Sequence, residues 1–530
     1  MINTTLGSGG MITAPHHMAA EAGRDVLCEG GTAVEAMVTA AAVIAVVYPH
    51  MNAIGGDGFW LVGAPGEAPV GIDACGPAAG LATPGWYRER GHAAIPARGP
   101  AAALTVPGTI AGWQAALAQP GASSGRLPLA RLLAPAVALA RAGVPVTAGQ
   151  AELTHAKLDQ LIDVPGFADT FLSADGSVPG YGARIVQQQL ADTLEQLGRA
   201  GLDDFYRGDL AQSMATHLEA LGSPLRRNDL EAFEALCVEP LSLGTGNTRL
   251  YNMPPPTQGL ASLMILGVFD RLGITAGEGF AHVHGLVEAT KQAFRVRDSH
   301  VTDPDYMPTP AARFLDADRL AAAAHDIDPA HAAPWPHPAA PGDTIWMGAI
   351  DAEGRSVSFI QSIYWEYGSG VVLPDTGVLM QNRGMSFGLE PDHPQALAPG
   401  RRPFHTLNPA MARFDDGRQM VYGTMGGEGQ PQTQAALFTR YARFGMPLQA
   451  AITAPRWLLG RTWGDSSTSL KLESRLPEAL IEELRAAGHA IEMAGEFDSM
   501  MGHAGAIVRH PDGLLEGAAD PRSDGRVATA

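Results

Sequence analysis

Two stretches near residue 350 have the residue pattern of β-strands. TIWMGAID and SVSFIQSIY are rich in β-branched and aromatic residues, and the short polar stretch AEGR separates them. This pattern predicts a β-hairpin. The preceding residues, about 321–343, are rich in Ala, Pro and His, which predicts a disordered tether without regular elements. Thr344 is therefore expected where the tether meets a strand.

Helical periodicity prevails in the first two-thirds of the chain. Residues 19–47 predict two helices with a Gly-Gly break between them, and Thr32 has the spacing to Glu35 of a capping box. Residues 252–272 and 282–304 predict two further helices, the first of them behind a triple-proline turn. Strand-like segments are more frequent in the last third. The overall prediction is the α+β class.

Composition narrows the possible functions. The 530 residues are 46% hydrophobic and 17% charged, which is typical of a globular protein with a large core. Length alone suggests roughly two to four domains. The formal net charge of −19 argues against a surface that binds nucleic acid and against docking on anionic membranes.

The cysteines and the apolar segments bear on location. Three cysteines, Cys28, Cys75 and Cys237, are too few and too far apart for a disulfide framework or a C-x-x-C metal motif. The first residues lack the basic and apolar regions of a secretory signal. The longest apolar run, 36–48, is too short to span a membrane and predicts a buried helix. These features predict a cytoplasmic protein.

Thr344 is a candidate nucleophile. A threonine hydroxyl reacts poorly at neutral pH unless a general base lies beside it. A free α-amine has a pKa of roughly 7.7–8, so an N-terminal threonine carries its own base. This chemistry requires cleavage of the chain before Thr344, for which an unstructured tether is suited. The alternative is that Thr344 only begins a strand.

The stretch GTMGGEG, residues 423–429, is a candidate oxyanion hole. A Gly-Gly pair after a strand lets successive backbone N–H groups converge on an anion. The alternative is a plain turn between a strand and a helix. A phosphate-binding loop is disfavoured because no Lys-Ser/Thr pair follows the glycines.

Other patterns give weaker signals. GASSG at 121–125 matches the nucleophile elbow by spelling, but a proline precedes it and the stretch predicts a polar loop. Asp57, in IGGDGF, is equally compatible with a site and with a turn. No metal site is expected, because no metal-ligand spacing is found around the paired histidines, which are His16, His17, His282 and His284.

Seven motifs occur in the order found in the gamma-glutamyltransferase family of N-terminal-nucleophile hydrolases, and the chain resembles that family over nearly its whole length. The motifs are GGTAVEAMVTAAAVIAVVYPHMNAIGGDGF, VPGTIAGW, MPPPTQG, HVHGLVEATKQAFRVRDSHVTDPDY, GDTIWMGAID, YGSGVVLPDTGVLMQN and MGGEGQPQT. The resemblance implies a four-layer αββα sandwich. It also strengthens the interpretation of Thr344 as a nucleophile.

The resemblance implies how such a chain works. Autocatalytic cleavage between Asp343 and Thr344 would give a large fragment, 1–343, and a small fragment, 344–530, that form one folded unit. This heterodimer could pair further into a dimer of heterodimers. Thr344 would then attack substrate amides, with the N–H groups of Gly426 and Gly427 as oxyanion hole. Ser362, at the place of a second family threonine, would support Thr344, and no cofactor or metal is implied.

The departures from the family concern the substrate. Asp73 stands where the family has the arginine that binds the α-carboxylate of a gamma-glutamyl group. Ser386 stands where an acid would bind the α-amine. Tyr364 replaces an asparagine, and His405 and Thr406 replace paired serines. Both contacts to the gamma-glutamyl zwitterion are thus missing by this comparison.

Arg383 is the new cation, at a position where the family has glutamine. A guanidinium near the nucleophile would suit a carboxylate next to the scissile amide. The alternative is a buried ion pair with Asp73 or Glu428. Arg383, Tyr364, His405 and Thr406 are therefore the predicted substrate-binding residues.

The variant motifs GDTIW, SFIQSIY, LPDTGVLMQNRG and FHTLNPAMA most resemble the oxamate amidohydrolase branch of the family. This resemblance implies hydrolysis of oxamate to oxalate and ammonia, in purine and allantoin breakdown. Two enzymatic alternatives remain open, a gamma-glutamyltransferase or glutathione hydrolase and a cephalosporin acylase. A third alternative is an uncleaved pseudoenzyme that uses the fold as a scaffold.

Overall fold

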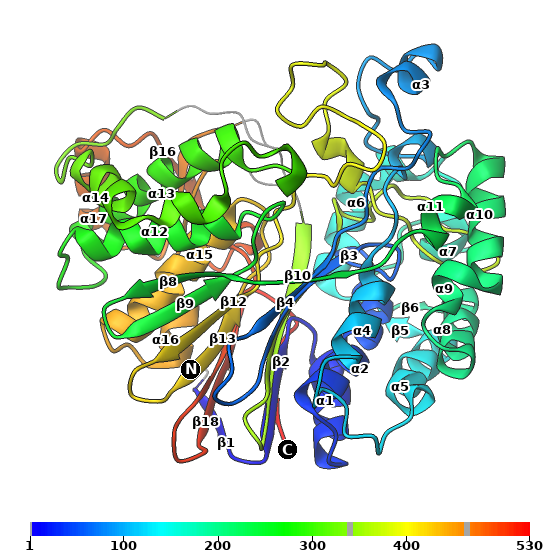
Figure 1. The fold of residues 1–530 in the computed structure, drawn as a ribbon, viewed down its shortest axis with the longest axis horizontal. Coiled ribbons are helices and arrows are strands. Elements are labelled where there is room, and N and C mark those ends of the chain that lie inside the picture. Colours follow the sequence, from blue (N-terminus) through cyan, green and yellow to red (C-terminus); the bar gives the residue numbers. More distant parts are fainter. Residues whose placement is uncertain (1–2, 336–342, 461–466) are drawn as a thin grey trace.

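Two seven-stranded antiparallel sheets face each other at the centre of the molecule (Figure 1). The computed structural model describes residues 3–335, 343–460 and 467–530. The first sheet has the order β1 (Thr5–Gly7), β18 (Leu515–Ala519), β17 (Gly505–Arg509), β13 (Gln419–Gly423), β12 (Ala410–Phe414), β9 (Thr248–Asn252) and β8 (Leu241–Thr245). The second has the order β19 (Arg526–Thr529), β2 (Gly10–Ala14), β10 (Asp343–Asp351), β11 (Ser356–Tyr364), β3 (Asp57–Gly63), β4 (Val70–Ala74) and β7 (Leu236–Val238).

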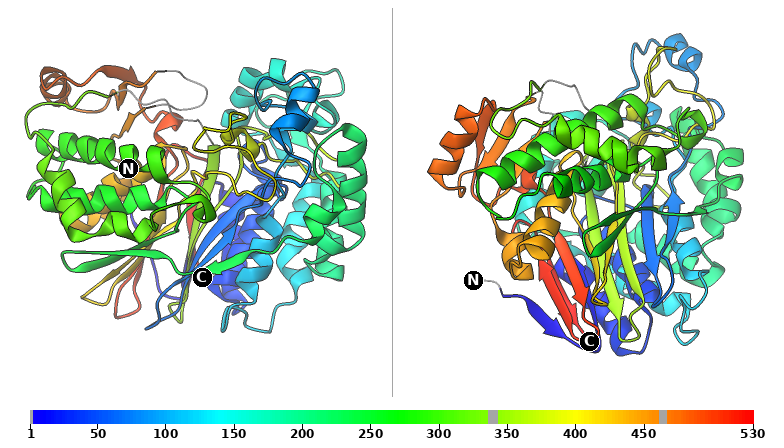
Figure 2. Two further views of the ribbon diagram at one scale, coloured as in Figure 1. Left: turned by 45° about the horizontal axis from the view of Figure 1, so that its top comes forward. Right: turned by 60° about the vertical axis from the view of Figure 1, so that its left-hand side comes forward.

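Helices cover the outer face of each sheet (Figures 1 and 2). On the second sheet lie α1 (His17–Cys28), α2 (Ala33–Val47) and α4 (Thr109–Leu117), with α3 (Pro84–Glu89), α5 (Leu129–Ala142), α6 (Ala148–Leu161), α7 (Phe167–Phe171), α8 (Gln188–Ala200), α9 (Asp204–Arg207), α10 (Asp209–Leu221) and α11 (Arg227–Glu231) on the same side. On the first sheet lie α12 (Gly259–Arg271), α13 (Phe280–His300), α14 (Ala317–His325), α15 (Gly429–Phe438), α16 (Leu448–Thr453) and α17 (Glu478–Ala486). Two small sheets add β5 (Val144–Pro145) with β6 (Arg184–Ile185), and β14 (Trp457–Leu459), β15 (Leu470–Glu473) and β16 (Ile491–Ala494).

The molecule thus has four layers, two sheets inside and helices on either side. Three apolar cores hold these layers together. One core lies between the second sheet and its helices, a second between the first sheet and its helices, and a third between the two sheets. Burial of apolar surface on both faces of each sheet is the main stabilising term. The predicted α+β class and αββα sandwich are confirmed.

Helix α2 shows why the sequence folds in this way. All of its residues are buried, because α1 and α5 pack against it on one side and β10 and β11 on the other. The predicted capping box is present: Thr32 accepts from the N–H of Glu35, and the Glu35 carboxylate accepts from the N–H of Thr32. A helix without a polar face needs such specific ends to fix its boundaries.

The predicted hairpin is present as β10 and β11, but the tether prediction is wrong for its first part. Residues 317–325 form α14, whose Leu320 is fully buried. The alanines that suggested low complexity are good helix formers, and one leucine is enough to dock the helix. Further on, Lys291 donates to the carbonyl of Ala333 at 2.7 Å. Residues 336–342 of the predicted tether lie outside the described residues.

A tryptophan and two glycines determine how closely the sheets approach. Trp346, on β10, points into the core between the sheets, and its indole N–H donates to Ser358 at 3.0 Å. A Cβ at Gly423 or Gly505 of the opposite sheet would lie 2.3 or 2.5 Å from the Trp346 ring. The absence of side chains there lets the ring fill the gap. Thr344, two residues earlier on the same face of the strand, is positioned by the same packing.

Gly423→Ala tests this packing. The added methyl group has no room beside the Trp346 ring, so we expect the free energy of unfolding to fall by about 2 kcal/mol, the cost of overpacking a core. Gly244→Ala is the matched control, because Gly244 lies in a strand of the same sheet with open space around its Cβ. Thermal unfolding of both variants and the parent is the measurement. Equal melting temperatures for the two variants would contradict the packing argument.

Candidate active site

Thr344 lies at the start of the central strand β10 and is fully buried. The register to β11 is irregular here, since Asp343 pairs with Tyr364 but Ile345 pairs with Gln361. Thr344 therefore lies opposite two residues, Ser362 and Ile363, in a β-bulge. Bulges re-aim a side chain, and they are frequent beside active sites.

The neighbouring strands bring two further polar residues to this end of the sheet. Ser362 of β11 pairs with Asp57 of β3, so Thr344, Ser362 and Asp57 lie side by side on three adjacent strands. The Ser362 hydroxyl accepts from the N–H of Tyr364 at 2.8 Å. Tyr364 has φ of +83°, a left-handed conformation that is strained for a bulky residue and is found mostly at functional sites.

Strand β13 ends at Gly423, a turn at 424–428 follows, and α15 begins at Gly429. Gly426 and Gly427 have φ of +114° and +53°, so both need the conformational freedom of glycine. Within the described part of the chain, their N–H groups donate no hydrogen bond, which leaves both as possible donors to an oxyanion.

Gln258, which sequence analysis missed, joins this turn to the His405–Thr406 segment. Its side-chain N–H group donates to the carbonyls of Gly427, at 2.7 Å, and of Thr406, at 2.8 Å. Its backbone N–H donates to the carbonyl of His405 at 2.9 Å. Gln258 belongs to the MPPPTQG motif, which is the only sequence signal that pointed to it.

Arg383 is buried against an aromatic ring. Its guanidinium carbon lies 3.8 Å from the centre of the Tyr364 ring, and Nη2 donates a long hydrogen bond to Thr406 Oγ1 at 3.4 Å. Its Nε and Nη1 atoms have no hydrogen-bond partner among the residues that the structure describes. Burial lowers the pKa of Arg383, while Tyr364 and Asp57 oppose this effect.

The two ion pairs considered for Arg383 are formed by other arginines. Asp73 pairs with Arg402 at 3.3 Å, and Glu428 pairs with Arg297 at 3.1 Å. Among the described residues, Arg383 forms no direct ion pair, although the nearby carboxylate of Asp57 favours its charged form. The ring that Arg383 contacts belongs to Tyr364, which pairs across the hairpin with Asp343, the residue before Thr344.

Asp57 and His405 form a buried pair beside Arg383. His405 Nε2 and Asp57 Oδ2 are 3.0 Å apart, and neither residue is exposed. Burial raises the pKa of Asp57 to about 7, although backbone N–H groups, Gln381 and Arg383 favour its charged form. Burial and Arg383 hold the pKa of His405 well below its usual value, so its ring is neutral. Asp57 begins strand β3 and is not a turn residue, and its part in a site stays a prediction.

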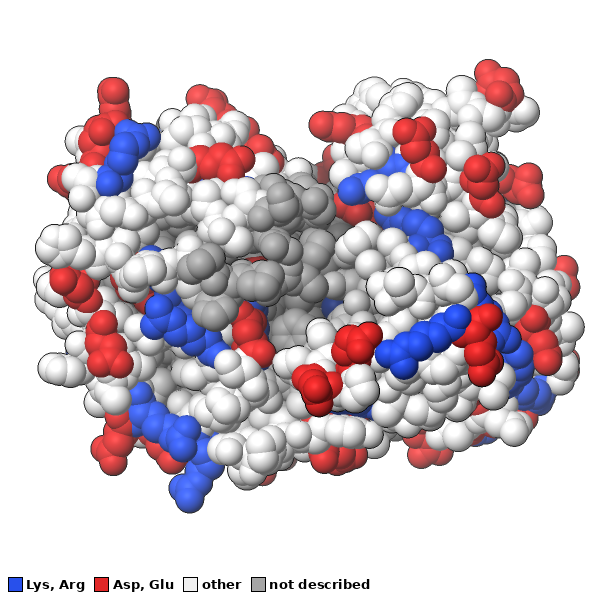
Figure 3. Space-filling model, turned by 90° about the horizontal axis from the view of Figure 1, so that it is seen from above, with Lys and Arg blue, Asp and Glu red and all other residues white. Residues whose placement is uncertain are grey.

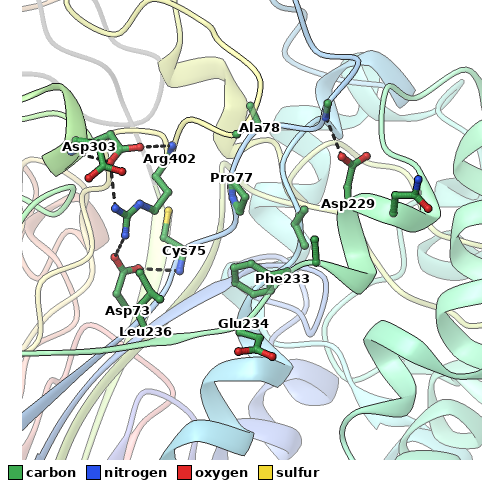
Figure 4. A pocket seen from close by; sticks show the side chains of 16 residues that line it. Asp73, Cys75, Pro77, Ala78, Asp229, Phe233, Glu234, Leu236, Asp303 and Arg402 are labelled. Atoms are coloured by element: carbon green, nitrogen blue, oxygen red, sulfur yellow. Dashed lines mark hydrogen bonds and ion pairs between the residues drawn. The ribbon is translucent and has the colours of Figure 1, made fainter.

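Asp73 lines a cavity of about 480 Å³ (Figure 4). Arg402 bridges Asp73 and Asp303 in this cavity, and Asp73 also accepts from the N–H of Cys75 at 2.9 Å. Burial raises the pKa of Asp73 to about 6, and Arg402 opposes this shift. Asp73, which stands where the family has an arginine, therefore forms an ion pair with Arg402, a residue distant in sequence.

A second cavity, of about 440 Å³, lies on the other side of residues 400–405 and reaches the glycine turn. Met385, Ser386, Phe404 and Glu428 are among its lining residues. The Ser386 hydroxyl has no hydrogen-bond partner in the described ranges. Seen from above, the molecule is hollowed between its two halves, and Lys and Arg side chains are interspersed with Asp and Glu (Figure 3).

The weaker sequence candidates have structural roles. Ser123 and Ser124 of GASSG hydrogen-bond to Glu35, where they reinforce the start of α2. His16 caps α1, and His282 contacts the hydroxyl of Thr439.

Two groups of buried side chains could hold a metal ion by their spacing. They are Asp57, Cys75 and His405, and His284, Glu288 and His489. A cation already lies beside each group, Arg383 at the first and Lys291, which binds Glu288 at 2.6 Å, at the second. The local charge therefore disfavours a further cation in both.

No helix in the described ranges is long and apolar enough to cross a bilayer.

The sequence profile of the gamma-glutamyltranspeptidase family matches residues 19–530. The oxamate amidohydrolase proenzyme of Klebsiella pneumoniae is 55% identical over all of both chains. The glutathione hydrolase-like YwrD proenzyme of Bacillus subtilis is 40% identical over 99% of both chains. The crystal structure of the cephalosporin acylase from Bacillus halodurans superposes with a TM-score of 0.91 at 32% identity, covering 100% of this chain and 97% of the other. The chain therefore belongs to the gamma-glutamyltranspeptidase family.

Proposed function

We propose that the chain is a proenzyme that cleaves itself between Asp343 and Thr344 and then hydrolyses oxamate to oxalate and ammonia. The buried guanidinium of Arg383, which forms no direct ion pair and has two nitrogen atoms without a hydrogen-bond partner among the described residues, is the observation that carries the substrate assignment. The similarity to an oxamate amidohydrolase proenzyme supports the same reaction. As a member of its family, the chain is an enzyme that acts on amide bonds.

The mechanism follows from the side chains around Thr344. The hydroxyl of Thr344 attacks the amide carbon while its own α-amine takes the proton. The N–H groups of Gly426 and Gly427 stabilise the oxyanion, and the intermediate collapses with release of ammonia, which takes up that proton. Water then attacks the oxalyl ester and regenerates the Thr344 hydroxyl. Ser362 lies opposite Thr344 in the bulge and orients it.

The strand order supports two fragments that stay together after cleavage. Each sheet combines strands from before and after residue 344; in the second sheet, for example, β10 and β11 lie between β2 and β3. Separation would break a backbone ladder in the middle of each sheet. We therefore propose a heterodimer of residues 1–343 and 344–530, with a dimer of heterodimers as a further possible assembly. Three unpaired cysteines, Cys28, Cys75 and Cys237, support a reducing, cytoplasmic location.

Each of the four predicted substrate-binding residues has a distinct role in this proposal. Arg383 binds the carboxylate, Thr406 and Tyr364 hold the guanidinium, and His405 lies next to them. A gamma-glutamyl substrate fits poorly, because Asp73 is engaged by Arg402 and Ser386 carries no charge for an α-amine. The same reasoning disfavours a glutathione hydrolase, and the small buried anion site disfavours the side chain of a cephalosporin.

Thr344→Ala tests the nucleophile. Without the hydroxyl, neither the chain cleavage nor amide hydrolysis can proceed, so we expect one intact chain of 530 residues and no ammonia release. Intact mass spectrometry and an ammonia assay on the same preparation are the measurements. The parent protein serves as control and should give two fragments that meet between residues 343 and 344. A split Thr344→Ala chain would exclude self-cleavage by this residue.

Arg383→Gln tests the anion site. Loss of a charge-assisted hydrogen bond, worth about 1.5–3 kcal/mol, should lower kcat/KM for oxamate roughly tenfold to a hundredfold. Oxamide is the matched control substrate, because it replaces the carboxylate by a neutral amide of the same shape, and its kcat/KM should change little. Arg383→Lys keeps the charge and should recover part of the loss. Equal losses with both substrates would remove Arg383 from substrate recognition.

A further inference from the structure

Three atoms beside the strand of Thr344 are buried and lack a hydrogen-bond partner within the part of the chain that the structure describes: Nε and Nη1 of Arg383 and Nδ1 of His405. Buried polar atoms in native proteins nearly always have a hydrogen-bond partner. The unpaired atoms therefore indicate which hydrogen-bonding groups a ligand must supply. The Arg383 atoms require an anion. What His405 Nδ1 requires depends on where the ring carries its proton.

The carboxylate of Asp57 fixes that proton. Its Oδ1 atom accepts from the N–H groups of Gly76 and Gly108, at 3.1 and 3.2 Å, and from Gln381 Nε2 at 3.0 Å. Burial raises the pKa of Asp57 to about 7, but three donors on one oxygen and the nearby Arg383 oppose this shift, so the carboxylate is ionised at a pH well above 7. The Oδ2 atom of the ionised carboxylate, 3.0 Å from His405 Nε2, then accepts a hydrogen bond from the ring N–H.

His405 Nδ1 is consequently a hydrogen-bond acceptor. The ring is neutral because burial disfavours its charged form, so a proton on Nε2 leaves a lone pair on Nδ1. The nearby thiol of Cys75 does not occupy it, since its contact is with the carbonyl of Pro403 at 4.0 Å. Phe59 packs its ring edge-on against the imidazole and holds it in place.

We propose that His405 Nδ1 accepts an N–H of the substrate's amide, and that Asp57 is the positioning residue that keeps this nitrogen an acceptor. The site would then recognise a ligand that combines a carboxylate with an N–H donor on the scissile group, and it would reject the corresponding ester. This inference rests on the proposed oxamate hydrolysis, since oxamate carries both groups within one small molecule.

The physical basis of the selectivity is the cost of leaving a buried acceptor unpaired. A site that is built to pair with an N–H group discriminates strongly against an analogue that lacks it. Monomethyl oxalate is such an analogue: it keeps the carboxylate and the reacting carbonyl but has no N–H. Both substrates yield oxalate, so one assay measures both reactions.

Asp57→Asn should reverse the tautomer without a change in shape. The three N–H donors at Oδ1 require an oxygen there, which leaves the NH2 group of the new side-chain amide facing His405 Nε2. Nε2 must then accept, and the ring proton moves to Nδ1, where it opposes the N–H of the substrate. The analogous change in a Ser-His-Asp triad acts in the same way.

The experiment compares kcat/KM for oxamate and for monomethyl oxalate at a pH above 7, where Asp57 is ionised. We expect Asp57→Asn and His405→Phe each to lower the ratio of oxamate to ester turnover by roughly tenfold or more, as the loss of one buried hydrogen bond predicts. Asp351→Asn, which changes another buried carboxylate that binds Arg355 and the N–H of Ala33, should leave the ratio as in the parent.

The outcomes separate this inference from the proposed function. Equal losses of oxamate and ester turnover in both variants would overturn the inference, with the reaction itself intact. A second test needs no substrate: in 15N spectra of the histidine-labelled protein, His405 should carry its proton on Nε2 in the parent and on Nδ1 in Asp57→Asn. A proton on Nδ1 in the parent overturns the inference even if the variants fail to fold. Absence of oxamate turnover in the parent overturns the proposed function instead.

Discussion

The central position of β10 is the constraint on which the site depends. This strand lies between β2 and β11 and packs across the molecule against β13 and β17 of the other sheet. Its first residues pair with β11 and its last four pair with β2, so the strand cannot shift without the loss of both backbone ladders and of the contacts around Trp346. A chain break at its start releases an end and leaves the strand itself where it was. In the proposed mechanism, Thr344 thus keeps after cleavage the position that folding gave it in the precursor.

The buried charges around this strand are of two kinds: those paired within the protein, and the one at Arg383 that can bind a substrate anion. Most buried charges near the site are neutralised internally, as in the pairs Arg297–Glu428 and Arg402–Asp73. Such pairs contribute little net stability, but a partner removed from them would cost several kcal/mol. Arg383 differs because the described part of the protein gives it an aromatic face, one long hydrogen bond to a hydroxyl and the nearby carboxylate of Asp57, but no direct ion pair. A buried guanidinium with these partners destabilises the folded protein. Binding of an anion of the right shape offsets this destabilisation.

Local sequence signals predicted the local structure well and the side-chain network poorly. The hairpin, the capping box and the glycine turn each depend on residues within about ten positions, and all are present. The tether was predicted too long, because Ala-rich composition does not distinguish a linker from a helix that docks through a single leucine. Arg402 reaches Asp73 across 329 positions and His405 reaches Asp57 across 348. No periodicity or spacing encodes such contacts, which arise only when distant strands are placed side by side. The family resemblance identified His405 as a site residue, but it gave no indication of its partner.

The size of the anion site follows from the same geometry. Arg383 is sealed by Tyr364 above it and by Thr406 beside it, and it is as buried as the core tryptophans. A carboxylate that reaches this guanidinium must be attached within a few bonds of the amide that Thr344 attacks. A long acyl chain would carry the carboxylate away from Arg383 or the amide away from the bulge in β10. The strained backbone at Tyr364 maintains this distance, because relaxing its left-handed conformation would move the ring that supports the guanidinium. Substrate length is therefore limited by the backbone of β11 as much as by any pocket wall.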